Sequence, residues 1–167
     1  KNFYRDALPV KIDENIYKYE NKETGNYSIY KFSPESGEFF PVESSLEKEG
    51  FTALEREIKA IEKLLGDPIT FDDKSIFDGW DRIYEKVGKE KAIAFSTGIS
   101  IPMQPIYLEA ALSYPEWIDI YLEYQTECAI AFIKEAVKHS ADFILGGGDL
   151  ATKNGPVYNP DIFRKFL

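Results

Sequence analysis

Hydrophobic residues recur at helical spacing in three stretches of the chain, which cover residues 52–65, 75–87 and 113–139. In each stretch the apolar side chains lie three or four positions apart, as on one face of an α-helix. All three stretches open with the form of a capping box, in which a hydroxyl residue is followed three positions later by an acidic one. The pattern therefore predicts three helices, the first capped by Thr52 and the last capped by Ser113.

Short runs of strand-forming residues lie between the helical stretches. Residues 27–32 and 39–42 flank a Ser-Pro-Glu-Ser-Gly segment, which predicts a β-hairpin. Residues 1–25 are polar and mixed, so we expect an extended entry followed by a turn. Residues 91–97 and 141–145 are short and largely apolar, which is typical of strands that are buried on both faces of a sheet.

The longest predicted helix lies between the two buried strands. A short helix, over residues 106–112, is expected to precede it. Parallel neighbours in a sheet need a long return path, and a helix of this length supplies one. The second half of the chain is therefore predicted to have the order β-α-β-α, in an α/β fold.

Composition narrows the classes of protein to which the chain can belong. Its 167 residues are 44% hydrophobic and 29% charged, as in an ordinary globular protein. The net charge of −9 argues against a nucleic-acid partner, because phosphate binding needs a basic surface. The long helix carries too many charges for a membrane span, so we expect no membrane partner. A single cysteine and no signal-like segment favour a cytoplasmic protein.

The two ends of the chain suggest a fragment. The chain starts at Lys1 without an initiator methionine and stops at Leu167 inside a growing helix. We therefore expect more protein on at least one side.

Candidate chemistry is concentrated after the two buried strands, because in parallel α/β folds the loops after strands line the ligand site. The second strand leads into Gly146-Gly147-Gly148-Asp149, whose glycines would let a ligand approach the backbone. From spacing alone, Asp149 is either a site carboxylate or a turn-forming aspartate. The first strand leads through Ser96 and Gly98 toward Tyr107, whose hydroxyl could bind a carboxylate or simply pack.

The remaining reactive residue types have structural explanations. His139 is the only histidine and lies at a predicted helix end, where it suits exposed carbonyls. Cys128 lies among apolar neighbours, where thiols usually behave as small hydrophobic groups. Together they cannot build a metal site, so we expect no metal and no cofactor within this chain. Asn159-Pro160-Asp161 has the form of a helix start.

The stretch from Ala141 to Leu167 resembles the uroporphyrinogen decarboxylase family, which also contains corrinoid-linked methyltransferases. The resemblance lies in a Gly/Ala-Asp strand, an acidic residue at its end, a Gly-Pro pair, and a proline and phenylalanine before a helix. Here Asn159-Pro160 stands where the family typically has Ser-Pro. The loop over residues 98–107 and the helix start over residues 114–116 resemble the preceding unit of the same family.

The resemblance implies a fold and a set of site residues. The fold would be a partial (β/α)8 TIM barrel with an N-terminal β-hairpin decoration. Residues 1–75 would form the hairpin and helix region and residues 76–167 the βα units of one incomplete domain. The candidate residues are Asp149 and Tyr107 for catalysis, and Ser96, Gly98, Met103, Gly147, Gly148 and Thr152 for substrate binding.

The resemblance also implies an activity for the full-length protein. The first expectation is a decarboxylase of porphyrin biosynthesis, a carbon–carbon lyase that acts on a tetrapyrrole carboxylate. The alternatives are a zinc- and corrinoid-linked methyltransferase, with zinc bound outside this chain, and a non-catalytic barrel fragment or binding module. The expected partners are a tetrapyrrole or corrinoid-type small molecule and, because a half-barrel edge must be covered, a second copy in a homodimer.

Overall fold

The chain is a mixed α/β protein. The computed structural model describes residues 9–71, 75–146, 151–153 and 155–166. Over these residues it contains six helices, a four-stranded antiparallel sheet, a two-stranded parallel sheet and a two-stranded antiparallel pair. Two compact units are present. The sheet unit holds the described residues up to Leu64 with Gln104–Tyr121, and the crossover unit holds Leu65–Met103 with the described residues from Leu122 onward.

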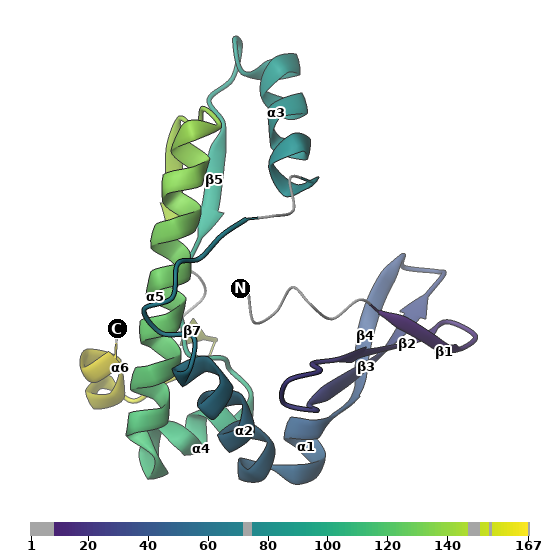
Figure 1. Cartoon of the computed structure of the whole chain (residues 1–167), viewed down its shortest axis with the longest axis vertical. Helices are drawn as coiled ribbons and strands as arrows, with labels where there is room; N and C mark the ends of the chain where they lie inside the picture. The colour runs from purple at the N-terminus through teal and green to yellow at the C-terminus, as the bar shows by residue number, and fades with distance from the viewer. Residues whose placement is uncertain (1–8, 72–74, 147–150, 154, 167) are drawn as a thin grey trace. The chain divides into compact units, whose positions relative to one another are not determined.

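The sheet unit begins with an antiparallel meander in the order β1-β2-β3-β4 (Figure 1). Its strands are β1 (Val10–Asp13), β2 (Ile16–Glu20), β3 (Tyr27–Ser33) and β4 (Glu38–Ser44). The predicted hairpin is confirmed as β3 and β4. Residues 1–25 were expected to form an extended entry followed by a turn; over the described part of that range β1 and β2 form a second hairpin, which the expectation did not include. Asn15 makes the turn between them with a positive φ of 58°.

One face of this meander is aromatic. Tyr17 is paired directly with Tyr30, and Phe32 with Phe39, so these rings share a face. The ring centroids of Phe32 and Phe39 lie 5.0 Å apart, and those of Tyr17 and Phe39 lie 5.5 Å apart. Aromatic pairs across strands thus stabilise a sheet whose strands contain few fully buried residues.

The helices of the sheet unit are α1 (Ser45–Glu49), α2 (Phe51–Glu62), α4 (Pro105–Ser113) and the first two turns of α5 (Pro115–Lys138). The helix predicted over residues 52–65 is confirmed as α2, but the cap predicted at Thr52 is wrong, because Gly50 is the N-cap residue of α2. The Ser44 hydroxyl accepts a hydrogen bond from the backbone N–H of Glu47 at 3.3 Å, so the helical region begins earlier and Thr52 lies inside α2. The predicted cap at Ser113 is also wrong, because Ser113 is the last residue of α4.

The core of the sheet unit lies between its helices. The buried core side chains come from α2, α4 and the start of α5 and are Ala53, Leu54, Ile58, Ala60, Ile61, Tyr107, Ala110, Ala111, Ile118 and Tyr121. The base of the meander is fixed to this core by polar contacts. The Asn26 amide donates to the Ala53 carbonyl at 2.9 Å, and the Tyr27 backbone N–H donates to the Ser45 hydroxyl at 2.9 Å.

The crossover unit contains two parallel strands that are joined through α4 and α5, as predicted. Its elements are α3 (Ser75–Val87), β5 (Ala94–Thr97), most of α5, β6 (Phe143–Gly146), β7 (Ala151–Thr152), β8 (Gly155–Pro156) and α6 (Pro160–Phe166). Ile93 and Asp142 join the starts of the two strands. The Ile93 N–H donates to the Asp142 carboxylate at 2.8 Å, and the Asp142 N–H donates to the Ile93 carbonyl at 3.1 Å. None of the described helices is both long and apolar enough to cross a membrane.

An aromatic cluster packs α3 and α5 against one face of the parallel strands. The Phe95 ring of β5 lies 5.2 Å from the Trp80 ring and 6.1 Å from the Phe132 ring, between centroids. Phe77 is buried and lies 6.4 Å from Phe95. This side of the strands is therefore the helix-covered face.

The expectation that both parallel strands are buried on both faces is wrong for this chain. Phe143 is 49% exposed and Leu145 is 57% exposed. Because their side chains alternate with Ile144 along β6, they lie on the face opposite to the aromatic cluster. The helices described here cover one face of the pair only.

The predicted helix start at Asn159 is confirmed. Its side-chain oxygen accepts hydrogen bonds from the backbone N–H groups of Asp161 at 3.0 Å and Ile162 at 2.8 Å, and Pro160 is the first residue of α6.

We expect Asn159→Ala to destabilise α6, because two backbone donors would lose their acceptor. The free energy of forming α6 should become less favourable by about 1 kcal/mol. Hydrogen exchange of the α6 amides would measure it, with Asn21→Ala in the sheet unit as a control that should leave α6 unchanged. Unchanged protection of α6 in the Asn159 variant would contradict this role.

Candidate functional site at the ends of two parallel strands

The carboxyl ends of β5 and β6 are level with each other. The register pairs Ala94 with Phe143, Ser96 with Leu145, and Thr97 with Gly146. Both strands run in the same direction, so Thr97 and Gly146 end at the same edge of the sheet. This edge is where the sequence places the candidate ligand site.

The side chains at these strand ends divide between two faces. Phe95 and its partner Ile144 lie on the helix-covered face. Ser96 and its partner Leu145 lie on the opposite face, and both are exposed. The Ser96 side chain is therefore exposed on that face, and its expected role in substrate binding stays a prediction.

A hydrogen bond ties together the two segments that follow the strands. The Tyr158 hydroxyl, from the segment between β8 and α6, donates to the Ile101 carbonyl in the loop after β5. Both residues are buried, and burial raises the pKa of Tyr158. The same loop is held on α5, because the Ser100 N–H donates to the Gln125 side-chain oxygen at 2.9 Å. Tyr158 is not among the residues predicted from the sequence, although its position between a Gly-Pro pair and an Asn-Pro pair marks it as an aromatic residue in an otherwise loop-forming segment.

The remaining predicted residues of the crossover unit fall into three groups. Gly98 and Met103 are exposed in the loop after β5. Thr152 belongs to β7 and is paired with Gly155 of β8. Gly147, Gly148 and Asp149 lie outside the described residues.

Tyr107 belongs to the sheet unit, where it packs in the core. It is 3% exposed, and its hydroxyl donates to the Glu57 carboxylate at 2.9 Å. Its ring lies 5.3 Å from that of Tyr121. Burial raises the pKa of Tyr107, and the neighbouring Glu57 raises it further. The catalytic role expected for Tyr107 stays a prediction, and the contacts in its own unit are structural.

The single histidine joins α3 to the end of α5. The His139 ring stacks on Phe77 at 4.7 Å, and its Nδ1 lies 2.8 Å from the Asp81 carboxylate. The His139 carbonyl accepts a hydrogen bond from the Trp80 indole at 2.9 Å. Cys128 is half-buried, and burial raises its pKa, which disfavours the reactive thiolate. The described residues contain no group of three or more potential metal ligands.

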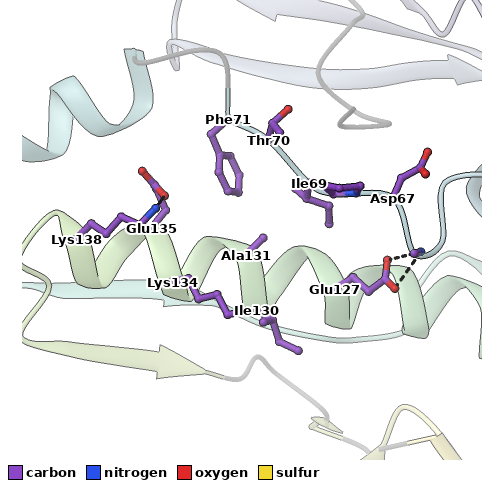
Figure 2. Close-up of a pocket in the computed structure, with 12 residues that line it drawn as sticks. Asp67, Ile69, Thr70, Phe71, Glu127, Ile130, Ala131, Lys134, Glu135 and Lys138 are labelled. Carbon is purple, nitrogen blue, oxygen red and sulfur yellow. Dashed lines mark hydrogen bonds and ion pairs between the residues drawn. The ribbon is translucent and has the colours of Figure 1, made fainter.

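A separate pocket of about 560 Å³ lies between residues 66–71 and α5 (Figure 2). Phe71 and Ala131 point toward each other across it, and the Glu127 carboxylate accepts from the Gly66 N–H at 3.1 Å. Its charged lining residues are Asp67, Glu127, Lys134, Glu135 and Lys138. None of the described residues that line it is a serine, cysteine or histidine. None of the predicted site residues that the structure describes lines this pocket, and the strand ends are the better candidate.

Tyr158→Phe should loosen the strand-end loops without disturbing the core. The change removes one hydrogen bond and leaves the ring in place, so we expect the free energy of unfolding to fall by about 1 kcal/mol. Hydrogen exchange should be faster for amides after Thr97 than for those of α5. If the amides after Thr97 are protected from exchange as strongly in the variant as in the parent protein, this bond has no role in ordering the site.

Comparisons with protein-family models, with curated proteins and with solved structures each found no match to this chain.

Proposed function

We propose that this chain supplies two neighbouring strands of a (β/α)8 barrel enzyme of the uroporphyrinogen decarboxylase type. The reaction would be the removal of a carboxyl group from a tetrapyrrole. Protonation of a pyrrole places positive charge on the ring, and breaking the bond to the carboxylate returns an electron pair to it as CO2 leaves. Groups at the barrel mouth would stabilise that developing charge.

The observation that carries the proposal is that β5 and β6 are parallel neighbours whose carboxyl ends lie at the same height. Parallel strands joined by a helical crossover are the building unit of such barrels, and their ligand sites lie at the carboxyl ends of the strands. Thr97 and Gly146 end together, and the Tyr158 bond to Ile101 holds the following segments side by side.

The exposed face of the pair gives independent support. Parallel sheets occur almost only where both faces are covered. Phe143 and Leu145 are large apolar side chains that are about half exposed. A barrel would cover them, because side chains from further strands fill its interior in layers.

The test is turnover by the complete gene product. Uroporphyrinogen should lose CO2 without added metal, and Asp149→Asn should lower kcat/KM by about 100-fold or more, because a carboxylate at the mouth stabilises the cationic ring. Asp67→Asn, from the pocket of Figure 2, is the control and should keep full activity. Absence of both tetrapyrrole binding and CO2 release would refute the proposal.

Measurements on the same purified protein distinguish the decarboxylase from the methyltransferase alternative. Stoichiometric zinc in the complete gene product, together with methyl transfer to a thiol and no CO2 release, would favour that branch. A protein that carries out neither reaction but forms a stable oligomer would favour the binding module.

A further inference from the structure

The pocket shown in Figure 2 divides its charges between two ends. Asp67 and the Glu127 carboxylate lie toward one end, and Lys134 and Lys138 lie toward the other. Lys138 is paired with Glu135 at 2.7 Å. Neither Asp67 nor Lys134 forms an ion pair or a side-chain hydrogen bond with another described residue. One end of the pocket therefore presents uncompensated negative charge, and the other presents an uncompensated ammonium group.

The middle of the pocket is apolar. Phe71 and Ala131 point toward each other across it, and Ile69 also lines it. The Phe71 ring is held in place, because its centroid lies 4.5 Å from that of Phe132 and 5.7 Å from that of Phe77. The volume of about 560 Å³ is that of a small-molecule site. The lining thus matches an occupant that has an apolar centre and opposite charges at its two ends.

One wall of the pocket offers unpaired backbone groups. Residues 68–70 belong to no helix or strand, and the backbone N–H and carbonyl groups of Ile69 and Thr70 form no hydrogen bond with another described residue. An extended peptide uses such groups when it binds beside a segment of a protein as a further strand. The unpaired main chain, together with the separated charges, points to a peptide as the occupant.

The spacing of the charges along α5 sets the length of that peptide. Lys134 follows Glu127 by about two helical turns, which is about 10 Å along the helix axis. An extended chain covers at most about 3.5 Å per residue, so a tripeptide reaches from one charge to the other. Its central side chain then lies in the apolar middle of the pocket, between Phe71 and Ala131.

We propose that this pocket binds short peptides that have free termini and an apolar central residue. The N-terminal ammonium group lies beside Asp67 and Glu127, and the C-terminal carboxylate pairs with Lys134. The peptide backbone forms hydrogen bonds with Ile69 and Thr70. Binding at this pocket does not depend on the proposed decarboxylase activity.

Calorimetric titration of the purified protein with the tripeptide Ala-Phe-Ala tests the proposal. We expect saturable binding with a Kd of about 1 mM or lower. Acetylating the N-terminus of the peptide, or amidating its C-terminus, should each weaken binding by about 5-fold or more, because each removes one charged contact. Free phenylalanine is too short to reach both ends and should bind more weakly by a similar factor. Absence of saturable binding, or equal binding of these four ligands, would overturn the proposal.

Variants of the protein assign the two ends of the peptide. In Lys134→Gln, amidation of the peptide should no longer change its affinity, whereas acetylation should still weaken binding. In Asp67→Asn, the effect of acetylation should shrink and that of amidation should remain. Lys86→Gln is the control, because Lys86 is exposed on α3 and does not line the pocket, so both effects should persist in full. If amidation weakens binding to Lys134→Gln as much as to the parent protein, Lys134 does not hold the carboxylate and the proposal is wrong.

Discussion

Replacing Phe77 with alanine should lower the free energy of unfolding by about 3–5 kcal/mol, as for other buried aromatic residues. Phe77 is buried in the crossover unit and contacts the rings of Phe95, Phe132 and His139. Alanine would leave a cavity where these rings meet, and the surrounding rings come from β5, from α5 and from the residue that follows α5, which cannot all move inward together.

Urea denaturation measures this loss, and Ile83→Ala is the matched control. Ile83 is on the same helix but is 54% exposed, so its truncation should change stability by about 0.5 kcal/mol or less. Similar losses in the two variants would show that the aromatic cluster does not anchor α3.

Tyr107→Phe should lower the free energy of unfolding by about 1–3 kcal/mol, because the buried Glu57 carboxylate loses a hydrogen-bond donor. The ring and its contact with Tyr121 are kept, so the change isolates the hydroxyl. Tyr17→Phe is the control, since Tyr17 lies on the partly exposed face of the meander and should tolerate the change within about 0.5 kcal/mol.

The same variant distinguishes packing from catalysis. A structural hydroxyl predicts that activity per folded molecule is unchanged in Tyr107→Phe once stability is taken into account. A loss of kcat at a temperature where the variant is fully folded would instead support the catalytic role that the family resemblance implies.

The sequence predicted the crossover best. The long amphipathic stretch strongly favours a helix, and a helix of that length between two short apolar runs supplies the return path that a parallel pair needs. Helix starts were predicted less well, because Ser44-Ser45-Leu46-Glu47 and Thr52-Ala53-Leu54-Glu55 offer the same capping pattern. A helix begins near each of these two patterns, because Gly50 has a positive φ of 58° and so lets α2 follow α1 directly.

The first hairpin was missed for a different reason. Its strands alternate apolar residues with Lys11, Asp13 and Lys18, and the sheet is exposed on both faces, so no buried stripe marks them. The place of Ser96 near the end of a strand could be predicted from the short apolar run that precedes it. The hydrogen bond of Tyr158 could not be predicted, because its hydroxyl donates to a carbonyl 57 positions away and no local sequence pattern indicates such a contact.

The long crossover also has a consequence for how the chain reaches this structure. Ile93 and Asp142, which join the starts of the parallel strands, are 49 positions apart, whereas the meander pairs neighbouring segments. Contacts distant in sequence form slowly, since closing the intervening loop costs entropy before any contact repays it. During synthesis the meander can form while the ribosome is still adding α5, and β5 must wait for β6 with its apolar face uncovered. That interval is when the chain would depend most on chaperones.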